Sequence, residues 1–264
     1  MALFKISYFS NSLAKEMEME VILPQKTENT PDWSQDLLSD LPVLYLLHGM
    51  GGNENNWLRR TRFERLIRNT ALAVVIPNGD LSWYNNTTYG LKYFDALAID
   101  LPKIVHEFFP QISQNPDKNF IAGASMGGYG AFKTALATKQ FGYAASLSGA
   151  LLGIENKELR TFRDAEYWHG VFGDQFENPK NNLLELAQRK IKNIDEIPKL
   201  FAWCGKEDFL FEDNENLVND FKNIGINIDY RVNEGTHDWY YWDQQIETVL
   251  EWLPIDYVKE ERLS

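Results

Sequence analysis

The sequence predicts an α/β fold in which helices cover both faces of a mostly parallel sheet. Short runs of continuously apolar residues alternate along the chain with segments whose apolar residues recur at helical spacing. Such continuous runs are typical of strands buried on both faces. The 264 residues suit one large α/β domain. We therefore expect a single domain spanning residues 1–264.

The first two expected strands form an antiparallel pair, because residues 5–9 and 17–23 alternate apolar and polar side chains. This alternation is typical of strands with one solvated face. A polar connection leads to the first buried strand, and an amphipathic segment begins near Trp57. The buried strands are expected at 43–47, 72–76, 120–122, 143–147, 200–204 and 226–232, and the main helices at 93–109, 127–139 and 239–253.

Residues 153–197 interrupt this alternation, because they contain helix-like pieces and polar turns but no good strand pattern. We interpret them as a helical insertion that forms a lid over the functional site. The alternative is an ordinary helical excursion at the periphery.

The charge balance argues against several classes of partner. The chain has 38 acidic and 26 basic residues, a formal net charge of −12. Such a surface repels phosphate backbones and anionic lipids, so neither nucleic acid nor a membrane surface is an expected partner. The N-terminus lacks the apolar core of a signal peptide, and no run approaches the roughly 18 apolar residues of a membrane span. We expect a cytoplasmic protein, with Cys204 as a buried, inert thiol.

The clearest functional motif is Gly123-Ala124-Ser125-Met126-Gly127, which matches the G-x-S-x-G nucleophile elbow. An expected strand precedes the motif and an expected helix follows it, as the elbow requires. The sharp turn between them needs residues without side chains on either side of the serine. Ser125 is therefore the predicted nucleophile.

A nucleophilic serine needs a base, and the chain has four histidines. His237 lies between the last expected strand and the last expected helix, where the base of an α/β-hydrolase belongs. His48 precedes a Gly-rich turn and is expected to shape that loop. His106 falls within a helical pattern, and His169 falls in the expected lid, where a structural role is favoured over substrate contact. His237 is the predicted base.

The orienting acid should lie between serine and histidine in chain order, at the end of a strand. Asp208 is the best candidate, and Glu207 is its immediate rival. Asp213 lies further along, where capping of a helix N-terminus explains it better. We expect Asp208 to hold the imidazole in its reactive tautomer.

Two backbone amides should stabilise the oxyanion. One is Met126, directly after the nucleophile, and the other is Met50 or Gly51 in the Gly-rich turn after the strand at 43–47. Trp57, Trp83, Tyr84 and Trp239 are candidates for substrate-binding aromatics, with core packing as the alternative. Clusters of His, Cys and Asp at metal-ligand spacing are absent from the sequence, so no metal or other cofactor is expected.

Four segments together resemble the tributyrin esterase family, within the esterase D, S-formylglutathione hydrolase and antigen 85 group of α/β-hydrolases. The segments are residues 46–53 (LLHGMGGN), 123–130 (GASMGGYG), 202–210 (AWCGKEDFL) and 235–242 (GTHDWYYW). The resemblance implies the α/β-hydrolase fold and a serine carboxylesterase that hydrolyses short-chain acyl esters through an acyl-enzyme. It also implies Ser125, Asp208 and His237 as the catalytic triad, with Met126 and Met50 as the oxyanion donors. Members of the family are typically cytoplasmic and often homo-oligomeric.

The sequence departs from the family pattern at Ala124, where a larger apolar residue such as Leu is expected. We expect this departure to leave catalysis intact and to alter the local acyl pocket slightly. The same triad also serves an S-formylglutathione hydrolase-type thioesterase and an acetyl or feruloyl esterase, and these remain alternatives. A non-catalytic binding protein with the hydrolase fold is a remote alternative, because it predicts a missing triad member.

Overall fold

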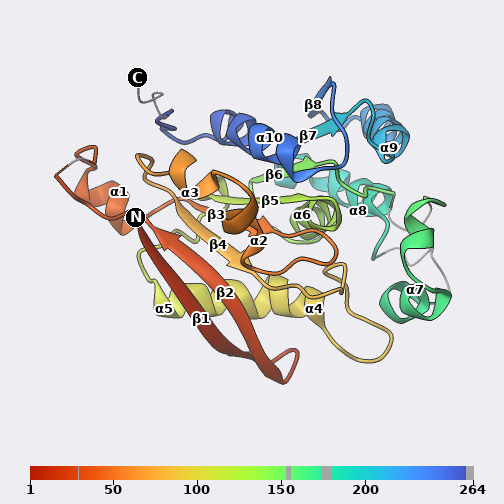
Figure 1. Ribbon diagram of the computed structural model, residues 1–264, viewed down its shortest axis with the longest axis horizontal. Helices are drawn as coiled ribbons and strands as arrows, with labels where there is room; N and C mark the ends of the chain where they lie inside the picture. The colour runs from red at the N-terminus through yellow and green to blue at the C-terminus, as the bar shows by residue number, and fades with distance from the viewer. Residues whose placement is uncertain (29, 153–155, 174–179, 260–264) are drawn as a thin grey trace.

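The strands of the computed structural model, which describes residues 1–28, 30–152, 156–173 and 180–259, form one eight-stranded sheet. The strand order is β1-β2-β4-β3-β5-β6-β7-β8. The pairs from β4 to β8 are parallel, whereas β1 and β2 form an antiparallel hairpin at one edge (Figure 1). The strands are β1 (Ala2–Ser10), β2 (Lys15–Leu23), β3 (Val43–Leu47), β4 (Ala73–Pro77), β5 (Asn119–Ala124), β6 (Tyr143–Leu147), β7 (Lys199–Gly205) and β8 (Ile228–Asn233).

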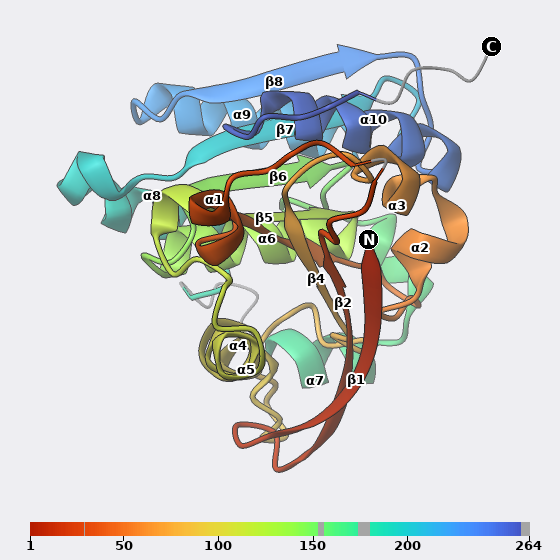
Figure 2. The same ribbon diagram turned by 90° about the vertical axis from the view of Figure 1, so that its left-hand side faces the viewer.

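Helices cover both faces of this sheet, as Figures 1 and 2 show, which confirms the predicted fold class. Helices α2, α3 and α10 bury one face, and α5, α6, α8 and α9 bury the other. The described α-helices are α1 (Gln35–Ser39), α2 (Asn56–Arg60), α3 (Phe63–Leu66), α4 (Tyr93–Asp95), α5 (Leu101–Phe108), α6 (Met126–Ala137), α7 (Ala165–Phe172), α8 (Leu183–Lys190), α9 (Phe211–Asn223) and α10 (Trp239–Trp252). Within the described residues, none of the helices combines the length and the hydrophobicity that a membrane crossing requires.

The buried strands agree closely with the sequence pattern. The expected strands at 43–47 and 143–147 have the same bounds as β3 and β6, and the other buried strands differ by no more than two residues at either end. Cys204 is fully buried in β7, and burial raises the pKa of its thiol. A buried thiol that stays protonated is unreactive, as expected.

The single helix expected at 93–109 is interrupted. A π-helical turn at Ala96–Asp100 separates α4 from α5. This turn contains the buried Asp100, whose Oδ2 accepts hydrogen bonds from the Ser10 hydroxyl at 2.6 Å and the Ser12 amide at 2.7 Å. The helix is thereby tied to the β1–β2 hairpin, a contact that helical spacing alone does not reveal.

The expected solvated face of the hairpin is also only partly present. Glu20 is 2% exposed, and one of its carboxylate oxygens pairs with the Lys5 Nζ at 2.8 Å. Every residue of the second half of β2, from Met19 to Leu23, is buried, so this part of the strand is covered on both faces. The alternation therefore predicted the strand correctly but predicted the exposure of Glu20 wrongly.

The described parts of the segment expected as a lid, residues 156–173 and 180–197, contain helices and turns and no strand. They comprise α7, α8 and two 3₁₀ turns, Leu159–Phe162 and Ile191–Glu196. Helix α8 lies against α6 (Figure 1), whose first residues follow the candidate nucleophile. This segment, the expected insertion, therefore packs through α8 against the helix that begins after the candidate nucleophile.

Candidate active site

Ser125 lies in the turn between β5 and α6, with a φ of +57° and a ψ of −119°. A non-glycine residue adopts a positive φ rarely, and at a strand-to-helix turn this conformation exposes the hydroxyl. Side chains are excluded on both sides of the turn. A Cβ on Gly123 would lie 2.4 Å from the Gly127 carbonyl carbon, and a Cβ on Gly127 would lie 2.5 Å from the Leu47 oxygen. The two motif glycines are required by this close packing.

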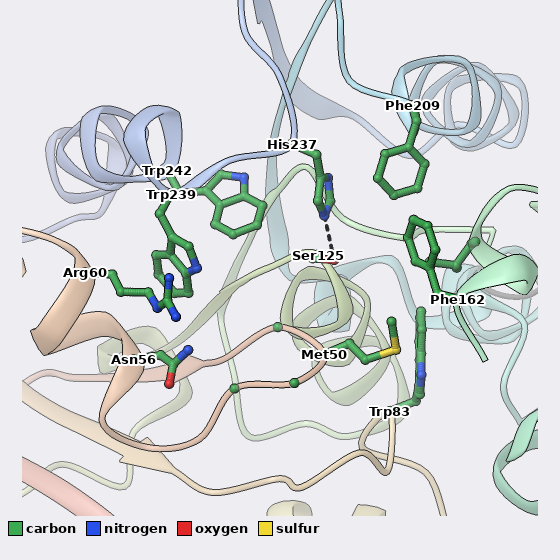
Figure 3. A pocket seen from close by; sticks show the side chains of 14 residues that line it. Met50, Asn56, Arg60, Trp83, Ser125, Phe162, Phe209, His237, Trp239 and Trp242 are labelled. Atoms are coloured by element: carbon green, nitrogen blue, oxygen red, sulfur yellow. Dashed lines mark hydrogen bonds between the residues drawn. The ribbon is translucent and has the colours of Figure 1, made fainter.

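The three residues predicted as the triad meet at the carboxyl end of the parallel strands, and Figure 3 shows Ser125 and His237 side by side. His237 Nε2 lies 2.9 Å from the Ser125 Oγ, and His237 Nδ1 lies 3.0 Å from Asp208 Oδ2. The Asp208 side chain is fully buried, whereas 19% of the His237 side chain is exposed. A buried carboxylate at Nδ1 favours the tautomer in which Nε2 is free to accept the serine proton.

The two adjacent carboxylates, Asp208 and Glu207, point to different partners. Asp208 faces His237, and its Oδ1 also accepts a hydrogen bond from the Leu210 amide at 2.9 Å. Glu207 Oε2 instead accepts the Gly235 amide at 2.7 Å, which holds the loop that carries His237. The geometry therefore distinguishes the acid that faces the imidazole from the one that supports its loop.

The expectation that Asp213 caps a helix is wrong. The N-cap position of α9 is Leu210, and Asp213 lies inside the first turn. Its Oδ2 accepts a hydrogen bond from Asn156 Nδ2 at 2.8 Å, and burial raises the pKa of its carboxyl. Asp213 thereby ties the insertion to α9.

His48 holds the turn after β3. Its Nδ1–H donates to the Gly49 oxygen at 2.8 Å, and its Nε2 accepts the Gly79 amide at 2.9 Å. Burial lowers the pKa of this imidazole, which favours the neutral form that both bonds require. Tyr84 donates its hydroxyl proton to the His48 oxygen at 2.9 Å. The side chains of His48 and Tyr84 therefore both shape the loop. His106 lies elsewhere, on the surface, with a ring nitrogen 2.8 Å from a Gln114 nitrogen.

The Gly-rich turn approaches Ser125 closely enough to form an oxyanion hole. The Gly52 amide donates to the Gly49 oxygen at 3.1 Å, and Gly51 has a φ of +79°, as a tight turn with glycine in its third position requires. A Cβ on Gly49 would lie 3.5 Å from the Ser125 Cβ. In the described part of the chain, the amides of Met50, Gly51 and Met126 donate to no protein atom. All three are available to a developing negative charge.

Ser125 and His237 open onto a cavity of about 240 Å³. Figure 3 shows two different halves. Apolar and aromatic side chains line one half, namely Met50, Trp83, Phe162 and Phe209, and the other half is lined by Asn56, Arg60, Trp239 and Trp242. Leu159 and Gly52 also line the cavity. Leu159 and Phe162 come from the insertion, so this segment contributes directly to the cavity wall.

The three predicted substrate-binding tryptophans have different positions. Trp83 and Trp239 line the cavity, whereas Trp57 does not. Trp57 is fully buried, and its Nε1–H donates to the Leu47 oxygen at 2.9 Å. Its indole instead packs against Trp239, with ring centroids 5.1 Å apart. Trp57 therefore supports the cavity wall from behind, and its assignment to substrate binding is corrected.

Sequence reasoning missed several lining residues. Phe209 directly follows Asp208, so its position next to the predicted acid could have identified it. Phe162 and Arg60 belong to no motif. Among the described residues, no group of three or more His, Cys, Asp or Glu side chains is placed to hold a metal ion. The groups that the described site offers for chemistry are the serine hydroxyl, the imidazole and the backbone amides.

Comparisons with known proteins agree with this geometry. The family model described as "Putative esterase" matches residues 10–253. An acetyl esterase from Caldicellulosiruptor saccharolyticus is 34% identical over 265 residues, which cover 96% of this chain and 98% of that protein.

Two solved structures from Staphylococcus aureus are each 31% identical, covering 96% of this chain and 98% of theirs. They are the fluorophosphonate-binding serine hydrolase F, with a TM-score of 0.83, and an S-formylglutathione hydrolase, with a TM-score of 0.81. A ferulic acid esterase with 23% identity and a TM-score of 0.80 shares the fold. The resemblance to the S-formylglutathione hydrolase and esterase D group is thereby confirmed. Since the family match extends over nearly the whole chain, this chain belongs to that esterase family and is a carboxylic ester hydrolase with the α/β-hydrolase fold.

Proposed function

We propose that this serine esterase hydrolyses esters of small acyl groups, with acetyl esters foremost, through an acyl-enzyme on Ser125. The observation that carries the proposal is the continuous hydrogen-bonded chain from Asp208 through His237 to Ser125 at the floor of the cavity. The identity with an acetyl esterase over nearly the full length of both chains supports a small acyl group. Acetyl is the short end of the short-chain range that the sequence resemblance implies.

In the proposed mechanism, Ser125 Oγ attacks the ester carbonyl while His237 Nε2 takes its proton. Asp208 stabilises the imidazolium that forms. The amide of Met126 and that of Met50 or Gly51 donate to the oxyanion of the tetrahedral intermediate. The alcohol then leaves with the proton from His237, and a water molecule activated by the same imidazole releases the acid and regenerates Ser125.

A thioesterase of the S-formylglutathione hydrolase type is the second candidate. It is favoured by the S-formylglutathione hydrolase of 31% identity, which spans nearly the same length. A formyl group is smaller than an acetyl group, so the same apolar half of the cavity would take either. The two candidates differ in the leaving group rather than in the catalytic residues.

The test is hydrolysis of p-nitrophenyl esters from acetyl to decanoyl, with S-formylglutathione and a feruloyl ester measured in parallel. We expect kcat/KM to be highest for the acetyl and other short chains, and Ser125→Ala to lower it by at least about 10³-fold. A serine-directed fluorophosphonate should label the wild-type protein and not this variant. Activity that survives in Ser125→Ala would disprove the nucleophile, and a preference for S-formylglutathione or the feruloyl ester would disprove the assignment to acetyl and other short-chain oxygen esters.

A further inference from the structure

The polar half of the cavity contains a cationic side chain without an anionic partner. Arg60, the last residue of α2, lines the cavity and points into it in Figure 3. Among the described residues, its guanidinium forms no hydrogen bond and no ion pair. The guanidinium lies over the ring of Trp239, with the Arg60 Cζ 5.9 Å from the ring centroid. The guanidinium thus keeps its donors available.

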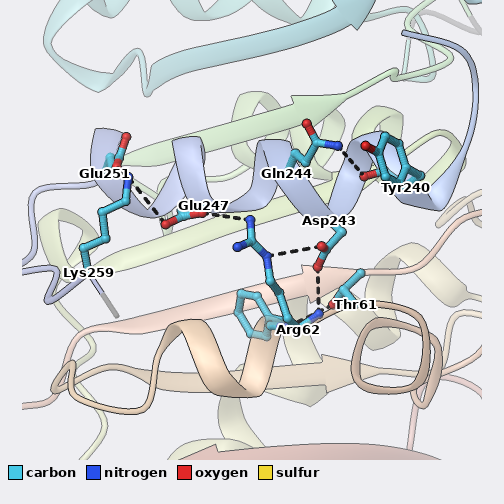
Figure 4. A network of polar contacts seen from close by, with 9 residues as sticks. Thr61, Arg62, Tyr240, Asp243, Gln244, Glu247, Glu251 and Lys259 are labelled. Atoms are coloured by element: carbon cyan, nitrogen blue, oxygen red, sulfur yellow. Dashed lines mark hydrogen bonds and ion pairs between the residues drawn. The ribbon is translucent and has the colours of Figure 1, made fainter. Parts of the chain in front are cut away.

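The three acidic side chains of α10 are bound to other cations (Figure 4). On α10, Asp243 Oδ2 lies 3.2 Å from the Arg62 Nε, and Glu247 Oε2 lies 2.8 Å from the Arg62 Nη2. Glu251 pairs with Lys259 at 2.8 Å. Although the chain has a net excess of carboxylates, none among the described residues pairs with Arg60.

Asn56 adds a second donor beside Arg60. Its Oδ1 accepts the Asn53 amide at 3.2 Å, which fixes the orientation of the side chain. Its Nδ2 lies over the Gly52 backbone, where a Cβ on Gly52 would be 2.9 Å away. The Asn56 amide and the Arg60 guanidinium share one side of the cavity with the Trp239 indole (Figure 3). This half offers N–H donors and an aromatic surface, which suit a planar group bearing a carboxylate.

We propose that Arg60, Asn56 and Trp239 form a subsite for the leaving group, and that the preferred substrates are acyl esters of alcohols that carry a carboxylate. The inference rests on the proposed esterase function. A small acyl group is uncharged and suits the apolar half beside Phe162 and Phe209, which leaves the half with Arg60 for the alcohol. The reaction is ordinary hydrolysis: water cleaves the bond between the carbonyl carbon and the alcohol oxygen, and the carboxylate itself is unchanged.

The test uses two acetyl esters of equal size that differ in one charge, those of 4-hydroxybenzoate and 4-hydroxybenzamide. For each protein, the kcat/KM of each ester is first divided by the rate constant for hydroxide-catalysed hydrolysis of that ester, which corrects for its intrinsic reactivity. The measured quantity is then the ratio of the benzoate value to the benzamide value. We expect Arg60→Gln to lower this ratio roughly tenfold, because it removes a charge-assisted bond to the carboxylate. The matched control is Arg59→Gln, which changes the net charge equally but lies outside the cavity lining and should preserve the ratio.

Equal ratios in the wild-type protein and Arg60→Gln would overturn the assignment of Arg60 to a subsite for the alcohol. A further pair places the charge on the acyl side, the 4-nitrophenyl esters of succinate and pentanoate. If Arg60→Gln lowers the succinate preference and leaves the benzoate ratio intact, the subsite holds the acyl group and the assignment to the alcohol is wrong. Failure of the proposed function itself looks different, because the wild-type protein would then hydrolyse neither the neutral nor the charged acetyl ester.

Discussion

Asp208 and Glu207 are adjacent carboxylates with different tasks, and side-chain direction alone separates them. Asp208 faces the His237 imidazole, whereas Glu207 accepts a backbone amide of the loop that carries His237. The chain order of serine, acid and histidine could be predicted from the sequence, and so could the identity of Ser125 and His237. The choice between the two acids depends on how the turn after β7 directs each side chain, which no local pattern encodes.

These different tasks predict different costs of neutralising each carboxylate. Asp208→Asn should lower kcat about 10⁴-fold, because the amide no longer stabilises the imidazolium and favours the wrong tautomer. Glu207→Gln should cost far less, since the glutamine oxygen can still accept the Gly235 amide. Steady-state kinetics on an acetyl ester, with a fold check by circular dichroism, measures both. Comparable losses in the two variants would contradict the assignment of Asp208.

Aromatic residues show where residue-level prediction fails. Trp57 and Trp83 are both fully buried, yet Trp83 lines the cavity and Trp57 lies behind its wall. An apolar side chain looks the same in a sequence whether it faces a core or a pocket. The distinction arises only when α2, α10 and the insertion pack around the elbow.

At the scale of elements, continuous apolar runs predicted the buried strands well, whereas segments with a mixed apolar and polar pattern were harder to predict. The π-helical turn at Ala96–Asp100 has the apolar spacing of a helix, so its widened backbone leaves no clear trace in the sequence. Glu20 follows the alternation of a half-exposed strand but is covered and paired with Lys5. In both cases a tertiary contact decides the outcome, one with Ser10 and Ser12 and one with Lys5.

The insertion predicts a limit on acyl length. Phe162 packs on Phe209 with ring centroids 5.5 Å apart at the apolar half of the cavity, and it is 45% exposed, so its removal should leave the core intact. Phe162→Ala should raise the kcat/KM of the hexanoyl ester relative to the acetyl ester roughly 3- to 10-fold, as expected when one or two more methylenes are buried.

The matched control for this prediction is Phe108→Ala, which removes a similarly exposed phenylalanine on α5, outside the cavity lining. The p-nitrophenyl ester series measures the chain-length profile of both variants. A profile that is unchanged in Phe162→Ala would mean that the insertion does not bound the acyl group. A profile that shifts equally in Phe108→Ala would mean that the effect is not local.

At the scale of the whole molecule, the fold class was predictable but the strand order was not. β3 lies between β4 and β5, and β2 pairs with β4. Such neighbours depend on which crossovers bury the most surface, and a single sequence does not specify these directly. The consequence for function is nevertheless simple, because parallel strands bring their carboxyl ends, and the loops with the triad, to one edge of the sheet.

Global stability should depend on pH through Lys133. This α6 residue is 3% exposed, and its Nζ donates to the Asn181 Oδ1 at 2.9 Å and to the Asn85 Oδ1. Burial lowers its pKa from 10.5 to about 7, with the charge of Asp95 acting in the opposite direction. Between these two pKa values the unfolded chain binds more protons than the folded one, so the free energy of unfolding rises with pH. Below about pH 7 the full destabilisation by this group is present.

Replacing Lys133 by Met should flatten this rise, which can reach about 1.4 kcal/mol per pH unit. Urea denaturation of both proteins at pH 7, 8 and 9 measures it. The difference between the two proteins isolates this residue, because Lys190, whose pKa burial lowers to about 8, is present in both. Parallel stability curves would show that Lys133 keeps an ordinary affinity for protons in the folded protein.

The spacing of the triad along the chain has a consequence for synthesis in the cell. Ser125 and His237 are separated by 112 positions, and the strands that position the triad, β5, β7 and β8, join the sheet in that order along the chain. Domains fold as the chain leaves the ribosome from its N-terminus. A nascent chain therefore carries its nucleophile long before its base. With the proposed triad, hydrolysis requires that the final strand and α10 be in place, so we expect unfinished chains to be inactive.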